Sequence, residues 1–220
     1  MKAIGNIQLI WRPGKGSRRI SIGSIKKNET DGVRFQYNAS GVEQAKKMGF
    51  EHYEGFPDTE KVYTENVLQI FGQRLIKSER SDLQDFYDFW NIDKTKVKHK
   101  FYMLAFTQGL LPTDNFEFLA DFNPVKNLTF VTEIANLTEL QIDSSAVKTG
   151  DSLRYELEPE NEFDKNAVKV FKDDLYLGHI KLIHCNVFHK TKKTFKLQVQ
   201  GIEKNGVLKR IFVKASLLKN

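Results

Sequence analysis

Short apolar and alternating runs, separated by glycine and asparagine, open the chain in a pattern typical of β-strands joined by turns. Three such runs occupy residues 8–11, 19–22 and 33–37. We expect them to form an antiparallel β-meander. The first turn, 13–17, contains Gly-Lys-Gly-Ser, but the first glycine of a phosphate-binding loop and its following helix are missing, so we interpret it as a hairpin loop.

Apolar residues then recur every three to four positions, which predicts helices near 42–48, over 66–71, after the capping residue Ser81, and over 97–108. Their aromatic side chains have the spacing of a helix face that packs on a core, so we expect core rather than a cofactor site. These side chains belong to Phe86, Phe89, Trp90, Phe101, Tyr102 and Phe106.

The period changes to that of strands after residue 128, with Asn123-Pro124 as the expected hinge and 134–142 as a loosely alternating connection. Five or more short strands in about ninety residues predict a small closed barrel. The expected fold class is therefore α+β, with a meander-plus-helices domain over 1–125 and a barrel domain over 126–220.

Composition limits the class of protein further. Hydrophobic residues make up 40% of the 220 residues and aromatic residues 12%, which excludes a disordered chain. The one cysteine, Cys185, allows no internal disulfide, and the start of the chain lacks the apolar stretch of a signal peptide. No apolar run approaches the ~18 to 20 residues of a membrane span, so we expect a cytoplasmic protein without membrane contact.

Charge is distributed unevenly. Residues 126–180 carry six basic and eleven acidic side chains, a net of −5, whereas residues 181–220 carry ten basic side chains against Glu203 alone, a net of +9. A polyanion would bind this last segment first, although a solvated lysine-rich surface gives the same count.

Residues 159–170 read PENEFDKNAVKV and are followed by LGHI at 177–180. This pattern resembles the signature of the HIRAN domain family, and the resemblance covers residues 128–218. It implies a small β-barrel of the OB or SH3 type with one short helix, which holds single-stranded DNA or a frayed 3′ end. It also implies that Asn161, Phe163, Asp164 and His179 lie at the DNA-holding pocket, and that the backbone-contacting lysines are Lys181, Lys190, Lys192, Lys193 and Lys196.

The chemistry of these residues agrees with that implication. Phe163 could stack on a base, Asp164 could accept from a sugar hydroxyl, and lysines release counterions from phosphates. The alternatives are that Phe163 belongs to the core and that Asp164 and Asn166 only tie the loop through side-chain to backbone hydrogen bonds. DNA-holding members of the family also place an aromatic pair on the strand before the motif. Counting back places Ile142 and Asp143 there, which leaves open whether the pocket is intact.

Residues 1–120 resemble the N-terminal subdomain of HipA-type proteins more faintly. The matching order of elements comprises SIGSI at 21–25, FGQRL at 71–75 and GLLPTD at 109–114. This resemblance implies a domain that docks a partner protein. No kinase motif follows, so phosphoryl transfer is not expected.

The cysteine and histidines raise two other chemistries, metal binding and nucleophilic catalysis. Cys185 and His189 have the i, i+4 spacing of zinc ligands, with His179 and His184 nearby, but no paired cysteine motif accompanies them, and we expect no metal and no cofactor. We also expect no cysteine nucleophile, because no orienting acid is evident. The sequence thus predicts a non-enzymatic DNA-binding adaptor. The alternative is a protein-binding regulator, such as an antitoxin-like or defence-system accessory subunit, that does not bind DNA.

Overall fold

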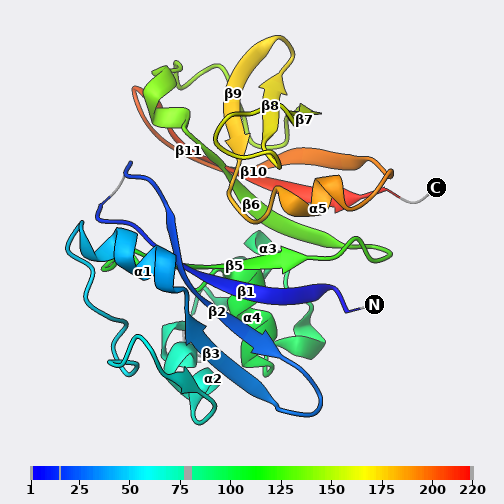
Figure 1. Cartoon of the computed structure of the whole chain (residues 1–220). Coiled ribbons are helices and arrows are strands. Elements are labelled where there is room, and N and C mark those ends of the chain that lie inside the picture. The colour runs from blue at the N-terminus through cyan, green and yellow to red at the C-terminus, as the bar shows by residue number, and fades with distance from the viewer. Residues whose placement is uncertain (1, 15, 77–80, 219–220) are drawn as a thin grey trace. The chain divides into compact units, whose positions relative to one another are not determined.

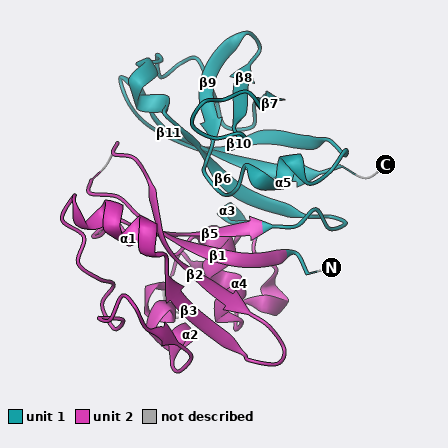
Figure 2. Ribbon diagram, in the orientation of Figure 1, with its two compact units in different colours: residues 1–3, 88–91, 122–220 teal, residues 4–87, 92–121 magenta. Residues whose placement is uncertain are grey.

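The computed structural model describes residues 2–14, 16–76 and 81–218 (Figure 1). The chain forms two compact units (Figure 2). The sheet unit consists of residues 4–87 and 92–121, and the barrel unit of residues 1–3, 88–91 and 122–220. One unit contains a meander sheet and the other a closed barrel with few helices, so the predicted α+β fold class is confirmed.

The sheet unit is built on a five-stranded sheet with the strand order β4-β3-β2-β1-β5. The meander pairs β1 with β2 and β2 with β3, all antiparallel. Gly23 in β2 has a structural role, because a Cβ atom there would lie 2.7 Å from the ring of Phe35. The elements of this part of the chain are β1 (Ile4–Trp11), β2 (Ile20–Lys27), β3 (Val33–Tyr37), α1 (Ala39–Lys46), β4 (Val62–Tyr63), α2 (Val67–Phe71), η1 (Gly72–Arg74), α3 (Leu83–Phe89), η2 (Lys94–Lys96), α4 (Lys100–Thr107) and β5 (Phe116–Phe122).

Aromatic rings fill the core of the sheet unit. Phe35 is fully buried, with its ring centroid 4.7 Å from that of Tyr37, 4.9 Å from Phe56 and 5.0 Å from Phe71. The Tyr37 hydroxyl donates to the Phe56 carbonyl at 2.8 Å and accepts from the Tyr53 amide at 2.7 Å. Burial is the main cause that raises the pKa of Tyr37 to about 12, so this hydroxyl stays a neutral structural group.

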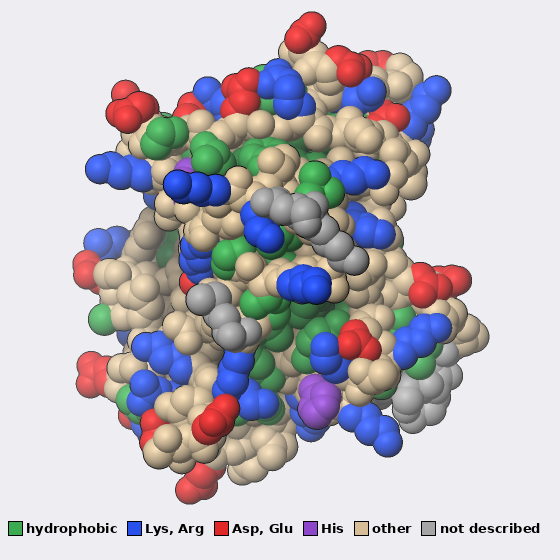
Figure 3. All heavy atoms as spheres, turned by 90° about the vertical axis from the view of Figure 1, so that its right-hand side faces the viewer, with side chains coloured by type: hydrophobic (Ala, Val, Ile, Leu, Met, Phe, Trp, Pro, Cys, Tyr) green, Lys and Arg blue, Asp and Glu red, His purple; other side chains and the backbone are tan. Residues whose placement is uncertain are grey.

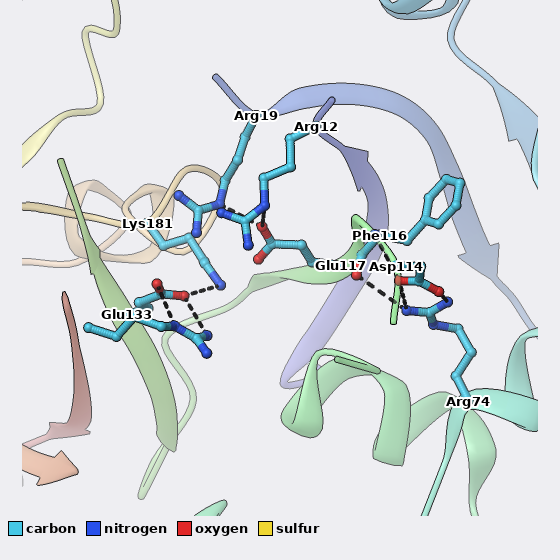
Figure 4. A network of polar contacts seen from close by, with 9 residues as sticks. Arg12, Arg19, Arg74, Asp114, Phe116, Glu117, Glu133 and Lys181 are labelled. Carbon is cyan, nitrogen blue, oxygen red and sulfur yellow. Dashed lines mark hydrogen bonds and ion pairs between the residues drawn. The ribbon is translucent and has the colours of Figure 1, made fainter. Parts of the chain in front are cut away.

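Buried charges in the sheet unit are paired (Figure 4). The Arg74 guanidinium binds both carboxylate oxygens of Asp114, one of them at 2.8 Å, and donates to the Phe116 carbonyl at 3.3 Å. Glu117 accepts from Arg19 Nε at 2.7 Å. A buried charge without a partner destabilises a fold, so we interpret these pairs as structural contacts and not as a ligand-binding site.

The barrel unit closes in the strand order β10-β11-β6-β9-β8-β7, with β7 paired to β10. The predicted small closed barrel is therefore confirmed. Gly178 in β9 has φ +120°, and a Cβ atom there would lie 2.2 Å from the Ala135 carbonyl oxygen, so only glycine lets β9 approach β6. The elements are β6 (Thr129–Ala135), η3 (Leu137–Leu140), β7 (Ser152–Leu157), β8 (Val168–Lys172), β9 (Leu175–Ile180), α5 (Asn186–His189), β10 (Phe195–Asn205) and β11 (Val207–Leu217).

Residues 88–91 belong to the barrel unit although they follow most of α3. The Phe89 ring lies 5.2 Å from that of Phe212, and Gln200 Nε2 donates to the Phe89 carbonyl at 3.0 Å. The chain thus contributes residues 1–3 and 88–91 to the barrel unit before it enters that unit again at residue 122. No sequence signal indicated the place of residues 88–91.

The structure does not form the loosely alternating connection predicted over 134–142. Strand β6 ends at Ala135, and the 3-10 helix η3 follows. Asn136 and Gln141 on either side of η3 have φ +66° and +49°, and such left-handed positions end an extended chain. Within the described residues, no helix has the length and apolar character that crossing a bilayer requires.

Candidate nucleic-acid interface

The loop 158–166 between β7 and β8 is held by its own side chains. Asn161 Oδ1 accepts from the amides of Phe163 and Asp164, both at 3.0 Å. Asp164 Oδ1 accepts from the Asn166 amide at 2.8 Å, and the Ala167 amide donates to the Asp164 carbonyl. These Asx-type bonds fix a bent backbone without an apolar core of its own.

The ring of Phe163 lies outside the core. Its exposed fraction is 85%, the largest of any large hydrophobic residue in the described chain. Burial of a Phe side chain stabilises a fold by ~1.5 to 3 kcal/mol, and this fold leaves that gain unused. The interpretation of Phe163 as a core residue is therefore wrong, and its role in stacking on a base stays a prediction.

Glu158 joins the base of the loop to the neighbouring strands. Its carboxylate accepts from Asn161 Nδ2 at 2.8 Å, lies 3.0 Å from His179 Nε2, and pairs with Lys169 Nζ at 2.6 Å. The bond to Lys169 is the largest cause that lowers the pKa of Glu158 to about 2, followed by the contact with His179. Glu158 is therefore ionised at neutral pH and holds the loop to β8 and β9.

His179 is occupied on both sides of its imidazole. Nε2 faces Glu158, and Nδ1 lies 3.0 Å from the Tyr176 hydroxyl. With both ring nitrogens engaged, His179 positions the loop in this structure rather than offering a nitrogen to a ligand. The predicted DNA-contacting role of His179 stays a prediction.

The loop also contacts α5 and Cys185, the residue that precedes it. Asn166 Nδ2 donates to Asn186 Oδ1 at 3.2 Å, and His189 Nε2 lies 3.0 Å from the Asn166 carbonyl oxygen. Asp164 Oδ2 is 3.6 Å from Cys185 Sγ. Asp164 and Asn166 thus do tie the loop, as one of the two interpretations predicted, and they tie it to the helix that precedes the lysines.

The lysines after α5 are exposed. Lys190, Lys192 and Lys193 follow the His189 contact directly, and Lys196 lies on β10. Lys190 Nζ donates to the Phe122 carbonyl at 3.1 Å. Figure 3 shows Lys and Arg side chains over much of the face that it presents, with Asp and Glu side chains interspersed.

Lys181 was predicted to contact phosphates, and that prediction was wrong. Its side chain is fully buried, and its Nζ lies 2.9 Å from Glu133 Oε2 (Figure 4). Arg210 also binds Glu133, through Nε at 3.0 Å and Nη2 at 3.1 Å. A sequence signal existed, because an acid within the apolar run FVTEIA of β6 requires a buried cation.

Ile142 and Asp143 do not form the strand before the motif, which corrects the count made from the sequence. That strand is β7, whose Tyr155 packs its ring 5.1 Å from Phe188. Asp143 instead forms an isolated bridge with Val207 and accepts from the amide of Ser145. Its carboxylate is therefore committed to a turn.

The cysteine and histidines contain no metal site that the structure describes: no group of three His, Cys, Asp or Glu side chains in that part of the chain is arranged to hold an ion. Burial, then the neighbouring Asp164 carboxylate, raises the pKa of Cys185 to about 12. The sulfur is thus a thiol at neutral pH and a poor nucleophile.

Comparison with known proteins gives one partial match. No family model and no curated protein matches the chain. Among solved structures, the HIRAN domain of human HLTF is similar to part of it, with 17% sequence identity and a TM-score of 0.32. The match covers 40% of this chain and 75% of that domain. The HipA-like interpretation of residues 1–125 has no counterpart in these comparisons and stays a prediction.

Sequence reasoning missed a set of side chains on the outer face of β7, β8 and β9. The Arg154 guanidinium lies 4.2 Å from the centroid of the Phe171 ring, which is 5.6 Å from that of Tyr176. Alternation along these strands was the signal, since the neighbouring Leu153, Val170 and Leu177 point inward. These groups continue the polar surface that begins at Glu158 and His179.

Proposed function

We propose that this protein is a non-enzymatic DNA-binding adaptor whose barrel unit holds single-stranded DNA or a 3′ end at the loop 158–166. The observation that carries the proposal is the exposed ring of Phe163 on a loop that is fixed by hydrogen bonds. A rigid exposed ring can stack on any base, and such stacking is worth ~1 to 3 kcal/mol per base. Because the loop is already ordered, little conformational entropy is lost when a base binds.

The lysines supply the second element of the proposal. The contact between His189 and the Asn166 carbonyl joins the loop to the segment with Lys190, Lys192 and Lys193. We infer that a strand bound at Phe163 continues toward these cationic side chains. Each phosphate that a lysine neutralises releases counterions, so binding should weaken steeply with salt.

The acids beside the ring favour a strand end over a continuous strand. Glu160 and Glu162 are exposed on the same loop as Phe163. A strand that continued past these carboxylates would bring phosphates next to like charges, whereas a strand that leaves toward Lys192 meets opposite charge. This asymmetry supports a terminal nucleotide at Phe163.

The remaining chain completes the adaptor. We propose that residues 1–125 dock a protein partner, which would bring that partner to DNA. The side chains of the barrel unit that could take part in a reaction have structural contacts instead. Both ring nitrogens of His179 are hydrogen-bonded, and Cys185 is a buried thiol. The proposal therefore assigns the barrel unit a binding role and no reaction.

Fluorescence anisotropy with labelled single-stranded, 3′-overhang and blunt-ended DNA tests this function. We expect salt-sensitive binding of the first two, and about ten-fold weaker binding or more for Phe163→Ala, since a tenfold change is ~1.4 kcal/mol and stacking is worth ~1 to 3 kcal/mol. Leu175→Ala is the matched control, because Leu175 is also an exposed apolar side chain of the barrel unit. Equal affinities for wild type and Phe163→Ala, or no binding at low salt, would overturn the proposal.

The acidic surroundings of Phe163 favour one alternative, a regulator that inserts this ring into a basic pocket of a protein partner and does not bind DNA. The double variant Glu160→Gln/Glu162→Gln separates the two. Removing two carboxylates should tighten DNA binding if DNA is the ligand and should weaken binding of a basic partner.

A further inference from the structure

A second basic surface lies in the sheet unit, just before α4. Residues 93–100 read DKTKVKHK, with four lysines and one histidine against the single acid Asp93. All four lysines and the histidine are exposed. We call this segment the basic turn. Its net charge of +3 over eight residues, with histidine neutral, is not offset by acids within the segment.

Stability of the local fold does not account for these cations. Lys98, His99 and Lys100 stand at the start of α4, where the helix dipole is positive and each added cation is unfavourable by ~0.3 to 1 kcal/mol. The first turn of α4 contains no acid, and the N-cap residue His99 makes no capping bond with its side chain. The lysines thus make the start of α4 less stable, because they repel the positive end of the helix dipole. A bound anion would neutralise this repulsion.

The single acid is already committed. Asp93 pairs with Lys96 Nζ at 2.8 Å and accepts from the amide and hydroxyl of Thr95 at 3.0 and 2.6 Å. These bonds, the one from Lys96 first, lower the pKa of Asp93 to about 2. Asp93 therefore stabilises the turn that presents the lysines and leaves Lys94 and Lys98 without a carboxylate in the segment.

The basic turn is also held in place and extended by a neighbouring strand. The Asp93 amide donates to the Tyr102 hydroxyl at 2.9 Å, which fixes the segment against α4. Lys27, at the end of β2, has its Nζ 5.7 Å from the ring centroid of Phe101 in the first turn of α4. A fifth lysine from a distant part of the sequence thus joins the cluster.

We propose that the basic turn and Lys27 form a sequence-independent contact with the phosphate backbone of a nucleic acid, separate from the loop at Phe163. Several point charges on flexible stems suit a line of phosphates. The segment has no exposed apolar side chain to enter a lipid surface, because its one hydrophobic residue, Val97, is half-buried. The proposal shares its class of ligand with the proposed function but uses no residue of the barrel unit.

The test is the salt dependence of binding of a labelled single-stranded oligonucleotide by the full chain. Lys94→Gln/Lys98→Gln should weaken binding several-fold at low salt and reduce the slope of log K against log salt by about 1.4, the value for two phosphate contacts on a single strand. Lys46→Gln/Lys47→Gln at the C-terminal end of α1 is the control, because it removes two exposed lysines of the same unit and changes the net charge equally. Thermal unfolding checks that both variants fold, and Lys94→Gln/Lys98→Gln should be at least as stable as the wild type, since it removes a cation from the start of α4.

The outcomes distinguish this inference from the proposed function. If the two lysine variants have equal slopes of log K against log salt, the inference about the basic turn is wrong, even where Phe163→Ala weakens binding. If Lys94→Gln/Lys98→Gln weakens binding and Phe163→Ala binds like the wild type, the inference about the basic turn stands and the proposed function of the barrel unit is wrong. Binding to anionic phosphatidylserine vesicles in place of the oligonucleotide would also overturn the inference.

Discussion

The barrel unit contains two groups of charged and polar side chains that share their residue types and differ in exposure. Around Glu133, Lys181 and Arg210 form a buried cluster that joins β6, the end of β9 and β11. Around Glu158, the loop side chains and Lys169 form a half-exposed cluster that leaves Phe163 in solvent. The first cluster holds strands together and the second presents a ring. Burial, more than residue type, therefore decides whether a cation stabilises the fold or meets a ligand.

The largest expected effect comes from breaking the buried cluster. Glu133→Gln leaves the fully buried Lys181 ammonium without its counter-charge, which should lower the free energy of unfolding by about 3 to 5 kcal/mol. Glu156→Gln removes an exposed carboxylate paired with Arg154 and should cost about 0 to 1 kcal/mol. Urea unfolding of both variants measures the difference. Similar losses would contradict the division into buried and exposed clusters.

The exposed lysines should act on binding and leave stability nearly unchanged. Lys192→Gln/Lys193→Gln should weaken binding of single-stranded DNA about ten-fold at low salt and lower the salt slope by about 1.4. Its midpoint of urea unfolding should match that of the wild type, since both side chains are exposed. Lys204→Gln/Lys209→Gln, near the turn between β10 and β11, gives the same change in net charge. Equal affinities of these two variants for DNA would show that the lysines after α5 do not contact it.

Asn161→Ala should have a smaller effect, on both the stability of the protein and the order of the loop that carries Phe163. The substitution removes the acceptor for two loop amides, and a net hydrogen bond is worth about 0.5 to 1.5 kcal/mol. We expect stability to fall by about 1 kcal/mol and the Phe163 amide to lose protection from hydrogen exchange. Unchanged exchange at residues 162–164 would show that other bonds order the loop.

The smallest effect should appear in acid. Glu158 has its pKa lowered from 4.5 to about 2, so the charged form stabilises the folded loop. That contribution is complete above about pH 4.5 and is lost as the pH falls through 2. The difference in unfolding free energy between wild type and Glu158→Gln should therefore shrink between these two values. A difference that stays constant would show that the carboxylate does not depend on Lys169 and His179 for its ionisation.

The kinds of element followed from the sequence because they rest on local chemistry. Gly and Asn turns between β-prone runs predicted the meander, and evenly spaced short strands predicted the closed barrel. The motif at 159–170 marked the bent loop, since Asn and Asp side chains bond to amides two or three residues ahead. That chemistry needs no information from distant residues.

The environment of a side chain could not be predicted from the sequence where its contact residue lies far away along the chain. Lys181 had the same appearance as Lys190, and only the register that pairs Ile134 with Ile180 places it beside Glu133. Residues 88–91 carried no mark of their place in the barrel unit, because Phe89 contacts Phe212 far along the chain. The basic turn lay within a long segment of nearly balanced charge.

The amino-acid sequence by itself determined the α+β class, the barrel and a rigid polar loop, because strand alternation and Asx bonding act over a few residues. Only the tertiary structure decided that Phe163 stays in solvent, that both nitrogens of His179 are engaged, and that Lys181 is buried. The physical reason is that solvent exposure and ion pairing depend on which strands lie side by side, and strand register is set by the closed sheet as a whole.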